Sequence, residues 1–496
     1  MHETYNLCNE NWIRTTSGRQ SLKTFFQNAH LINNLDYDDL LTNFAIMRFS
    51  LPFIYRAYGV NNSNEWKSVW SKGKFDDAII EYIEKWEHKF DLFSAEYPFY
   101  QDKEIAGHSK TKEVSTNKLR MISDNESAVF EKSFGFPELS FADAASNLVS
   151  YQLMSLCVGR GLMEKRSFFF AANGYRYPVM LFGNNLFESL MLNCMPLEHY
   201  KNSKDDKPFW ETDFPNGYNV ASVNGYMDYL TRPCKRVLLQ SRDGAVKSLR
   251  TFEDNKKLLR NDKLEMAIQY IKENIKDPFV IYMRDKKDYK TTQHYNQRFW
   301  KNFANLKLSS QGSDDCIFKN HRNVSYIDDD VILGYSCLYI KTDSKLCKFK
   351  DVSIQKLLLQ VKHMRDEDLS FMVEDYINSA VVICDSFSNS VRRILRLIKA
   401  YDRKLYPMSD YYTVNFWNYA DLCFKSFRSE LLNKKDTNNL EDTRKDTRKK
   451  YTKLLAHEAN RVLWAIANEA KNTDYHKVVM IISDLKKTIK EKTDGE

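Results

Sequence analysis

Two glycines and several cations stand close together at residues 157–166, in the stretch CVGRGLMEKR. Glycine lets the backbone adopt conformations, and approach a ligand at distances, that a side chain forbids. The nearby Arg160, Lys165 and Arg166 favour an anionic ligand. This glycine segment (residues 157–166) is therefore suited either to cradle a nucleotide or to contact a polynucleotide.

The glycine segment does not match the motifs that bind nucleotide phosphates. No GxxxxGK[ST] string occurs, so the lysine and hydroxyl that complete a P-loop are missing. After Gly159 and Gly161, the place of the third glycine in the dinucleotide pattern is taken by Glu164, whose charge would repel a pyrophosphate. The sequence thus disfavours nucleotide cradling.

Signals of catalysis and metal binding are weak. The sequence has no HExxH, HxH or GxSxG string, and His321-Arg322-Asn323 is not a complete nuclease motif. Three successive carboxylates at Asp328–Asp330 cannot all face one ion in an extended segment, which favours a solvated turn. We expect no catalytic residue, metal or cofactor. A metal-dependent nuclease or nucleotide-processing enzyme, and a helical adaptor that binds only proteins, stay open as alternatives.

The composition is typical of a folded protein without a membrane segment. The chain has 496 residues, of which 43% are hydrophobic and 14% aromatic, and no long uncharged apolar run appears. The N-terminus MHETYNLCNENW carries acids where a signal peptide would carry cations. Nine scattered cysteines without a CxxC pair indicate reduced, mostly buried thiols. We expect a cytoplasmic protein, whose net charge of +8 permits binding of nucleic acid.

The hydrophobic pattern predicts an α+β fold: a mixed α/β body with long loops over residues 1–365, followed by a C-terminal four-helix bundle over residues 366–496. In the body, the predicted helices cover residues 36–58, 75–93, 140–153 and 184–195, the third of them capped by Ser140, and a strand covers Cys234 to Gln240. Residues 103–125 are polar without periodicity, which indicates a mobile loop.

Apolar residues recur at helical spacing throughout the C-terminal region. The periodic segments cover residues 372–398, 411–432, 451–470 and 478–489. The segment from Lys425 to Lys453 contains ten Lys or Arg residues and five Asp or Glu residues, which gives it a local net charge of +5. The tandem DTRKDTRKK at 442–450 is expected to form a loop or an exposed helix start.

Several segments, read in order, resemble the CasA family, the large subunit of the type I-E CRISPR Cascade complex. The similar segments are Asn6-Leu7 with Asn11-Trp12-Ile13, FDLFSAEYPFYQ at 90–101, Ala128-Val129-Phe130, LSFADAASNLVSYQ at 139–152, Asn185 to Asn193, Gly225 to Thr231 with Lys235-Arg236-Val237, and Asp277-Pro278. Their order and spacing carry the resemblance, and the helical C-terminus agrees with it in kind.

The resemblance implies a non-catalytic subunit that reads a short protospacer-adjacent motif, mostly from the minor groove, while guide RNA reads the target by base pairing. By position, Gly159, Arg160 and Gly161 would form the motif-reading loop. Lys263 is our first choice for the family's lysine finger and Lys272 our second.

The resemblance also implies a wedge that parts the DNA strands on the turn after Gly334. The corresponding residues are Lys341, Thr342, Asp343, Ser344 and Lys345, which depart from the glutamine-tipped pattern of the family. Phosphate or strand contacts would come from Lys165, Arg166, Arg444, Lys445, Arg448 and Lys449.

The partners implied are the other Cascade subunits (backbone, small and guide-end-capping), CRISPR guide RNA, target double-stranded DNA and a recruited helicase-nuclease, with no membrane. The loop at 104–125, which carries Lys110, Lys112, Lys118 and Arg120, lies where the family contacts its complex and the end of the guide RNA. The expected role is motif recognition, strand opening with R-loop formation, and help in recruiting the helicase-nuclease.

Overall fold

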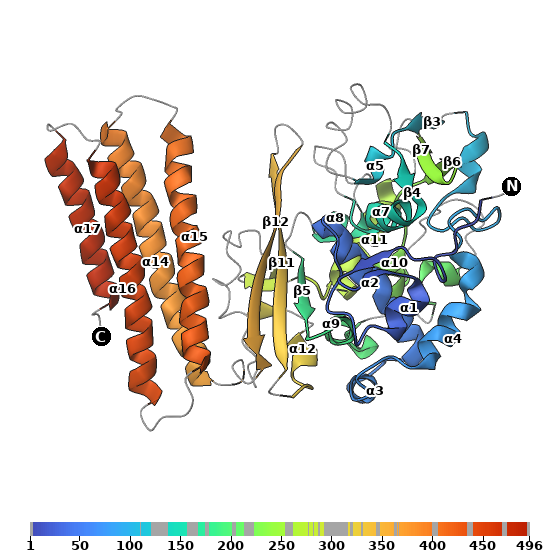
Figure 1. The fold of residues 1–496 in the computed structure, drawn as a ribbon, viewed down its shortest axis with the longest axis horizontal. Helices are drawn as coiled ribbons and strands as arrows, with labels where there is room; N and C mark the ends of the chain where they lie inside the picture. The colour runs from blue at the N-terminus through green and yellow to red at the C-terminus, as the bar shows by residue number, and fades with distance from the viewer. Residues whose placement is uncertain are drawn as a thin grey trace. The chain divides into compact units, whose positions relative to one another are not determined.

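The computed structural model describes residues 3–493 except 110, 121–136, 156–166, 174–177, 201–204, 213–222, 253–260, 276, 281, 286–287, 292–315, 318–320, 329–330, 344–347, 362–364, 366, 399–404, 434–439 and 469–473. The described residues up to Val361 form one compact unit, and those from Arg365 onward form a second. The elements of both are shown in Figure 1. The α+β fold class expected from the sequence is confirmed.

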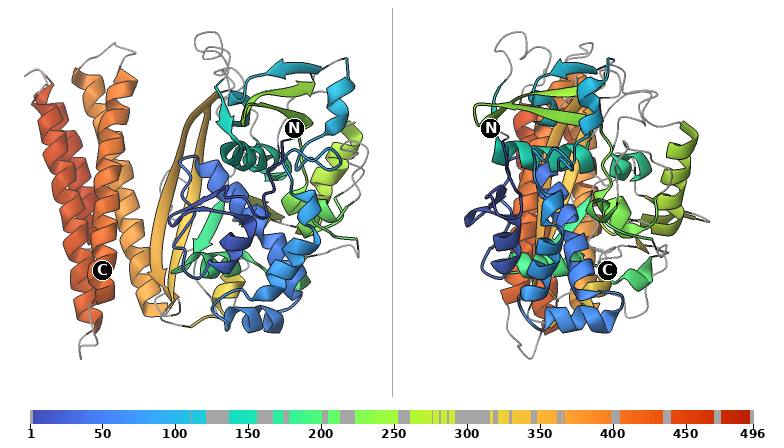
Figure 2. Two further views of the ribbon diagram at one scale, coloured as in Figure 1. Left: turned by 45° about the vertical axis from the view of Figure 1, so that its right-hand side comes forward. Right: turned by 90° about the vertical axis from the view of Figure 1, so that its right-hand side faces the viewer.

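The central element of the first unit is helix α2 (Leu40–Tyr58), drawn in blue in Figures 1 and 2. Asp39 caps its N-terminus by accepting a hydrogen bond from the Leu41 amide, and Gly59 ends it in the left-handed conformation at φ 60°. Nearly every side chain between these ends is buried, as expected for a helix that is apolar on all sides. Helix α2 contacts α4, α7, α9 and α10, so it holds the first unit together.

The other helices that the structure describes in the first unit are short. They are α1 (Leu22–Gln27), α3 (Ser63–Trp70), α4 (Asp77–Lys85), α5 (Asn117–Arg120), α7 (Phe141–Leu153), α8 (Phe168–Asn173), α9 (Leu186–Asn193), α10 (Tyr226–Thr231), α11 (Asn261–Tyr270) and α12 (His321–Val324). Turns of 3-10 type form η1 (Glu87–Lys89), η2 (Lys103–Gly107), η4 (Leu197–His199) and η5 (Phe209–Glu211), and η7 (Ile271–Ile275) is a π-helical turn.

The single helix predicted over 75–93 is wrong beyond Trp86. Helix α4 ends at Lys85, and η1 follows before the chain becomes extended. The Leu7 amide donates to the Phe90 carbonyl and the Leu92 amide donates to the Tyr5 carbonyl. Phe90 and Leu92 are fully buried in this arrangement. Pairing with the N-terminal segment therefore replaces the last turns of the expected helix.

Four antiparallel strands form a sheet at one side of the first unit: β3 (Thr111–Val114), β4 (Leu139–Ser140), β6 (Val237–Arg242) and β7 (Ala245–Phe252). A two-residue turn joins β6 to β7, and both of its residues, Asp243 and Gly244, have positive φ. Because β3 pairs with β7, and because η2 and α5 flank it, the interpretation of residues 103–125 as one mobile loop is wrong for 103–109 and 111–120.

A second sheet contains a long hairpin. Strands β11 (Ile332–Asp343) and β12 (Lys348–Gln360) pair along their whole length, and β5 (Val179–Phe182) adds to β11 only at Gly334–Cys337. Beyond Cys337, the two strands have no further strand partner among the residues that the structure describes. The end of the hairpin is therefore a two-stranded ribbon about 20 Å long. Figure 2 shows the hairpin in gold.

Two small sheets complete the described strands. Strands β1 (Ile13–Thr15) and β2 (Gly18–Gln20) form a short hairpin near the N-terminus. Strands β8 (Tyr282–Asp285), β9 (Asp288–Thr291) and β10 (Cys316–Ile317) form a three-stranded sheet in the order β10-β8-β9.

The second unit is a bundle of four helices, α14 (Glu367–Ile398), α15 (Leu405–Asn433), α16 (Leu440–Ala467) and α17 (Tyr475–Thr493), as expected from the sequence. Helix α14 contacts each of the other three. Its Tyr376 stacks on Phe427 of α15 with ring centroids 4.2 Å apart, and Phe387 stacks on Phe416 at 4.1 Å. Aromatic contacts therefore hold α14 and α15 together.

The cysteines whose surroundings are described agree with the expectation of free, mostly buried thiols. Cys8, Cys194, Cys384 and Cys423 are buried and Cys234 is half-buried, and all five are free. Among the described helices, none has a stretch apolar and long enough to cross a membrane.

Candidate nucleic-acid interface

Helix α7 leads directly into the glycine segment. The Ser140 hydroxyl caps its start by accepting a hydrogen bond from the Asp143 amide at 3.1 Å, which confirms the predicted capped start. Small side chains, Ala142, Ala144 and Ala145, are buried along its first turns and let it pack closely against α2. Helix α7 is thereby fixed to the core.

Gln152 is the buried polar residue that anchors the end of α7. Its Nε2 donates to the carbonyls of Tyr100 at 2.9 Å and Lys235 at 2.8 Å. Its Oε1 accepts from the amides of Cys234 at 2.9 Å and Lys235 at 2.7 Å. All four hydrogen bonds of the side-chain amide are made, although Gln152 is fully buried. One side chain thus ties α7 to two segments that lie far away in the sequence.

The described residues that flank the glycine segment are hydrogen-bonded to each other. The Ser167 amide donates to the Ser155 carbonyl at 2.8 Å. The Ser155 hydroxyl donates to the Tyr151 carbonyl at 2.8 Å and lies 3.3 Å from Cys234 Sγ. The described residues on either side of 156–166 are therefore held together by this hydrogen bond. The predicted Gly159, Arg160, Gly161, Lys165 and Arg166 themselves lie outside the described residues.

A buried ion pair supports the element that follows the glycine segment. Arg48 of α2 is 2% exposed and Asp277 is fully buried, and Arg48 Nη1 donates to Asp277 Oδ2 at 2.7 Å. Burial alone would lower the pKa of Arg48, but the carboxylate of Asp277 raises it overall. The guanidinium lies 4.9 Å from the ring centroid of Phe169 in α8 and 5.0 Å from that of Tyr229.

The Asp277 carboxylate also organises its own surroundings. The Tyr229 hydroxyl donates to Oδ2 at 2.5 Å and the Phe279 amide donates to Oδ1 at 2.8 Å. Asn173 at the end of α8 donates to the Tyr229 hydroxyl at 3.3 Å. This network joins α2, α8, α10 and the Asp277-Pro278 segment, so the role of Asp277 is to support the scaffold.

The Gly225 to Thr231 segment, which is part of the family resemblance, also has a role in the fold. A Cβ on Gly225 would lie 2.3 Å from the Asp206 side chain, so only glycine allows this approach. Asp206 accepts hydrogen bonds from the amides of Met227 and Asp228 at the start of α10. Burial raises the pKa of Asp206 to about 6, although the hydrogen bonds from these amides act in the opposite direction.

Both candidate lysines lie on elements that contact α8. Lys263 is on α11, and Lys272 is exposed on the π-helical turn η7, between the buried Ile271 and Ile275. Because α11 and η7 both pack on α8, the structure brings the lysine candidates to the element that directly follows the glycine segment. The π-helical geometry is typical of functional positions in helices.

The described residues of the predicted wedge lie at the end of strand β11 in the long hairpin. Lys341, Thr342 and Asp343 are the last residues of β11, where they pair with Asp351, Phe349 and Lys348, and the register shifts after Lys341. Ser344 and Lys345 lie outside the described residues. The described part of the predicted wedge, Lys341–Asp343, therefore lies at the far end of the ribbon, beyond its contact with β5.

The basic run at 442–450 belongs to the first turns of α16, so the helix-start interpretation is confirmed. Arg444, Lys445, Arg448 and Lys449 share this helix. Arg448 forms an ion pair with Asp375 of α14, whereas Lys445 and Lys449 are exposed. Arg448 thus contributes to the bundle, and Lys445 and Lys449 are the better candidates for contact with a strand.

Two supporting residues were not singled out from the sequence. Arg48 is a lone charge in the apolar stretch of α2, and such a charge requires a buried partner. Gln152 is a long polar residue at the end of an otherwise apolar and small-residue helix. Within the described ranges, no group of three or more His, Cys, Asp or Glu side chains is arranged to hold a metal ion.

Replacing Gln152 by glutamate tests the anchor. The carboxylate keeps the shape but loses both donors to the Tyr100 and Lys235 carbonyls, so we expect the free energy of unfolding to fall by about 1–3 kcal/mol. Denaturant unfolding measures the change, with Gln240→Glu as control because the Gln240 side chain donates to the carbonyl of its neighbour Leu239, at 3.2 Å, and ties no distant segments together. Equal losses in both variants would contradict the anchoring role.

Comparison with known proteins defines the class. The sequence profile of CRISPR-associated protein Cse1 matches residues 6–462. The chain is similar to Cse1 from Acidimicrobium ferrooxidans at 18% identity, with a TM-score of 0.72 over 100% of this chain and 99% of that one. CasA (Cse1) from Thermus thermophilus matches at 16% identity and a TM-score of 0.71, over 100% of both chains. A chain of a CRISPR RNA-guided surveillance complex matches at 16% identity and a TM-score of 0.66, over 98% of this chain and 99% of that one. Among curated proteins, none matches the sequence.

A mixed α+β body followed by a four-helix bundle is thus the fold that this chain shares, over nearly its whole length, with Cse1 structures and with a chain of a CRISPR RNA-guided surveillance complex. The chain belongs to the CRISPR-associated protein Cse1 family, the CasA large subunits of type I-E Cascade. It is accordingly a structural, non-catalytic Cascade subunit, so the nuclease and nucleotide-processing alternatives are wrong.

Proposed function

We propose that this Cascade subunit reads the protospacer-adjacent motif in double-stranded target DNA and promotes strand opening for R-loop formation. Gly159 and Gly161 read base edges in the minor groove, where a bare backbone can approach closely. Arg160, Lys165 and Arg166 hold the surrounding phosphates. The wedge at Lys341–Lys345 then parts the strands as guide RNA pairs with the target.

The observation that carries this proposal is the fixed base of the glycine segment. The Ser155–Ser167 hydrogen bond closes the base, and Gln152 and the Arg48–Asp277 pair secure the elements on either side. A probe that reads base edges needs a rigid support of this kind, because its position determines which edge it meets. The candidate lysines lie on α11 and η7, and both of these elements contact α8. This packing supports the lysines independently of the Ser155–Ser167 hydrogen bond.

The proposal also includes the partners of the chain and the basic residues that contact them. The chain binds guide RNA and the other Cascade subunits (backbone, small and guide-end-capping), in part through Lys112 on β3 and Lys118 on α5. Lys445 and Lys449 on the bundle contact DNA backbone or displaced strand, and the complex recruits a helicase-nuclease. The free thiols are compatible with work in the cytoplasm.

Alanine substitution of Lys263 and Lys272 tests which lysine contacts DNA. A base contact is worth about 1–3 kcal/mol, so its loss should weaken duplex binding about 5- to 150-fold on the preferred motif only. A phosphate contact should instead lower the slope of affinity against salt by about 1 on all sequences. Equilibrium binding by the assembled complex, across salt concentrations and motifs, separates these results.

Lys85→Ala is the matched control, because Lys85 is exposed on α4 and carries the same charge. If the Lys263 and Lys272 variants both behaved like this control, neither residue would be the lysine finger.

A further inference from the structure

The buried Asn193 completes the outer edge of the sheet that carries the long hairpin. Strand β5 pairs with β11 on one side, where Leu181 lies opposite Tyr335. On its other side, the Leu181 amide donates to Asn193 Oδ1 at 3.1 Å, and Asn193 Nδ2 donates to the Leu181 carbonyl at 2.7 Å. The side-chain amide therefore exchanges two hydrogen bonds with one residue of β5, as a neighbouring antiparallel strand would.

The start of β5 is held on the same side. The Val179 amide donates to the Phe279 carbonyl at 2.7 Å. Phe279 belongs to the segment that the Arg48–Asp277 pair secures. Residues two apart on a strand point their backbone groups to the same edge, so Val179 and Leu181 are both held at the edge that faces away from β11.

Asn323 holds the helix that presents Asn193. It is fully buried on α12, the helix that precedes the long hairpin in the chain. Its Nδ2 donates to three carbonyls at the end of α9, those of Met191, Leu192 and Cys194, at 3.4, 3.0 and 3.2 Å. A side-chain donor at this place satisfies carbonyls that a helix leaves without partners at its C-terminus. Asn323 therefore joins the chain before β11 to the end of α9.

Side chains from the core hold the same end of α9. The Trp66 indole of α3 donates to the Met191 carbonyl at 2.9 Å, and the Tyr55 hydroxyl of α2 donates to the Met195 carbonyl at 2.6 Å. Trp66 and Tyr55 are both buried. The end of α9 is thus fixed to α2 and α3, and the two asparagines connect it to β5 and to α12.

We propose that Asn193 and Asn323 are positioning residues for strand separation. Beyond Cys337 the hairpin has no further strand partner among the residues that the structure describes, so the pairing with β5 at its base directs the ribbon. An element that parts a duplex has to keep its place against strands that tend to close, which requires a rigid support. The inference rests on the proposed function, because it takes this hairpin to be the element that parts the strands.

Opening of duplex DNA by the assembled complex tests the proposal. A fluorescent base analogue beside the motif reports opening, and a target opened in advance reports binding without opening. Asn193→Ala and Asn323→Ala should each lower the extent or rate of opening by about 2- to 30-fold, as expected for changes within a coupling network. Binding of the opened target should be unchanged, because it depends on pairing with the guide RNA.

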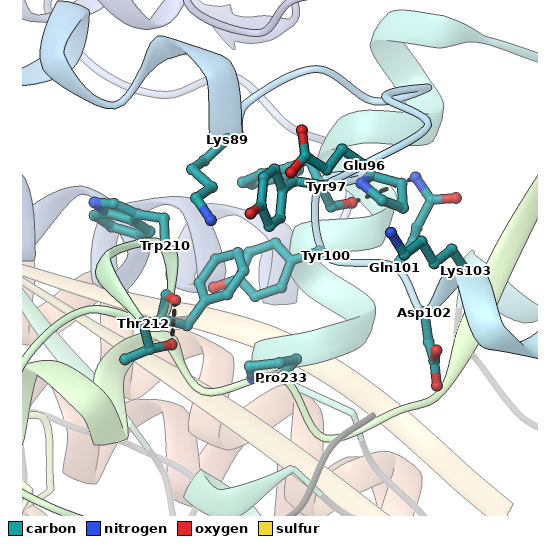
Figure 3. Close-up of a pocket in the computed structure, with 13 residues that line it drawn as sticks. Lys89, Glu96, Tyr97, Tyr100, Gln101, Asp102, Lys103, Trp210, Thr212 and Pro233 are labelled. Atoms are coloured by element: carbon teal, nitrogen blue, oxygen red, sulfur yellow. Dashed lines mark hydrogen bonds between the residues drawn. The ribbon is translucent and has the colours of Figure 1, made fainter. Parts of the chain in front are cut away.

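Two variants control for hydrogen bonds and stability lost elsewhere in the first unit. Thr212→Val removes the hydroxyl that donates to the Phe209 carbonyl at 2.6 Å, in the wall of the aromatic pocket shown in Figure 3. Ser21→Ala removes the cap of α1, where the Ser21 hydroxyl accepts from the Thr24 amide at 3.1 Å. Neither residue belongs to β5, α9 or α12, so both variants should open the duplex normally.

A shortened hairpin separates this inference from the proposed function. Lys341 pairs with Asp351, so replacing residues 342–350 by Asn-Gly joins the two strands through a two-residue turn and removes the wedge. If the shortened hairpin impairs opening while both asparagine variants behave like the controls, the positioning role is wrong and the proposed function stands. If the shortened hairpin opens the duplex normally, the wedge is wrong, and the positioning role with it.

The losses also have to be specific to opening. Equal losses on the duplex and on the opened target, or equal losses in the asparagine variants and in Ser21→Ala, would show that the asparagines serve stability alone and would overturn the proposal. Asn193→Ser and Asn323→Ser each keep one donor. They replace an alanine variant that does not enter the complex, and a smaller loss of opening in the same direction is then expected.

Discussion

Replacing Gly159 or Gly161 by aspartate is expected to weaken binding to duplex DNA that carries the recognition motif by roughly 10- to 100-fold. The added side chain would keep the backbone from the floor of the minor groove, which is only about 6 Å wide, and its charge would repel the phosphates. A target already opened into single strands should lose much less, because its recognition depends on pairing with the guide RNA.

The measurement compares the affinity of the assembled complex for the two targets. Gly244→Asp is a matched control, since Gly244 lies in the β6–β7 turn and is not part of the glycine segment. Because Gly244 has a positive φ, the control variant includes the backbone strain that replacing a glycine can cause, so a larger loss at Gly159 or Gly161 cannot come from such strain alone. Equal losses on duplex and opened targets would show that the segment contacts only the DNA backbone.

Local sequence signals predicted the elements that form by themselves. The Ser140 cap, the apolar run of α2 and the helical periodicity of the bundle are short-range patterns, and each gave an element close to the observed one. The Asp243-Gly244 pair is also a local hairpin signal, and it could have located the turn between β6 and β7.

Elements that depend on distant partners were not predictable from these patterns. Strand β3 forms because it pairs with β7, where Thr111 lies opposite Phe252, and no local sequence pattern predicts this pairing. The expected strand start at Cys234 moves to Val237 because the amides of Cys234 and Lys235 bond Gln152 instead. Gln152 lies 83 positions from Lys235, and Arg48 lies 229 from Asp277. The supports of the candidate site are therefore long-range contacts that only the fold reveals.

Replacing Asp277 by asparagine is expected to lower the free energy of unfolding of the first unit by about 3–5 kcal/mol. Asparagine keeps the shape of the side chain and an acceptor for the Tyr229 hydroxyl, but it removes the charge that faces Arg48. Arg48 is 2% exposed and cannot turn to water without disturbing α2. Thermal and denaturant unfolding measure the loss of stability. A sharp fall in the yield of soluble protein would indicate the same loss.

A comparison with an exposed ion pair separates the effect of burial on stability from the effect of losing a charge. Asp38, which is 95% exposed and lies 3.3 Å from Arg14, forms such a pair, so Asp38→Asn should cost less than about 1 kcal/mol. The double variant Arg48→Met with Asp277→Asn should recover much of the loss, because it removes the unpaired buried charge and keeps an apolar stem against Phe169. If the double variant were as unstable as Asp277→Asn alone, the unpaired charge would not be the cause, and the supporting role of this pair would have to lie in the hydrogen bonds of Asp277 to Tyr229 and Phe279.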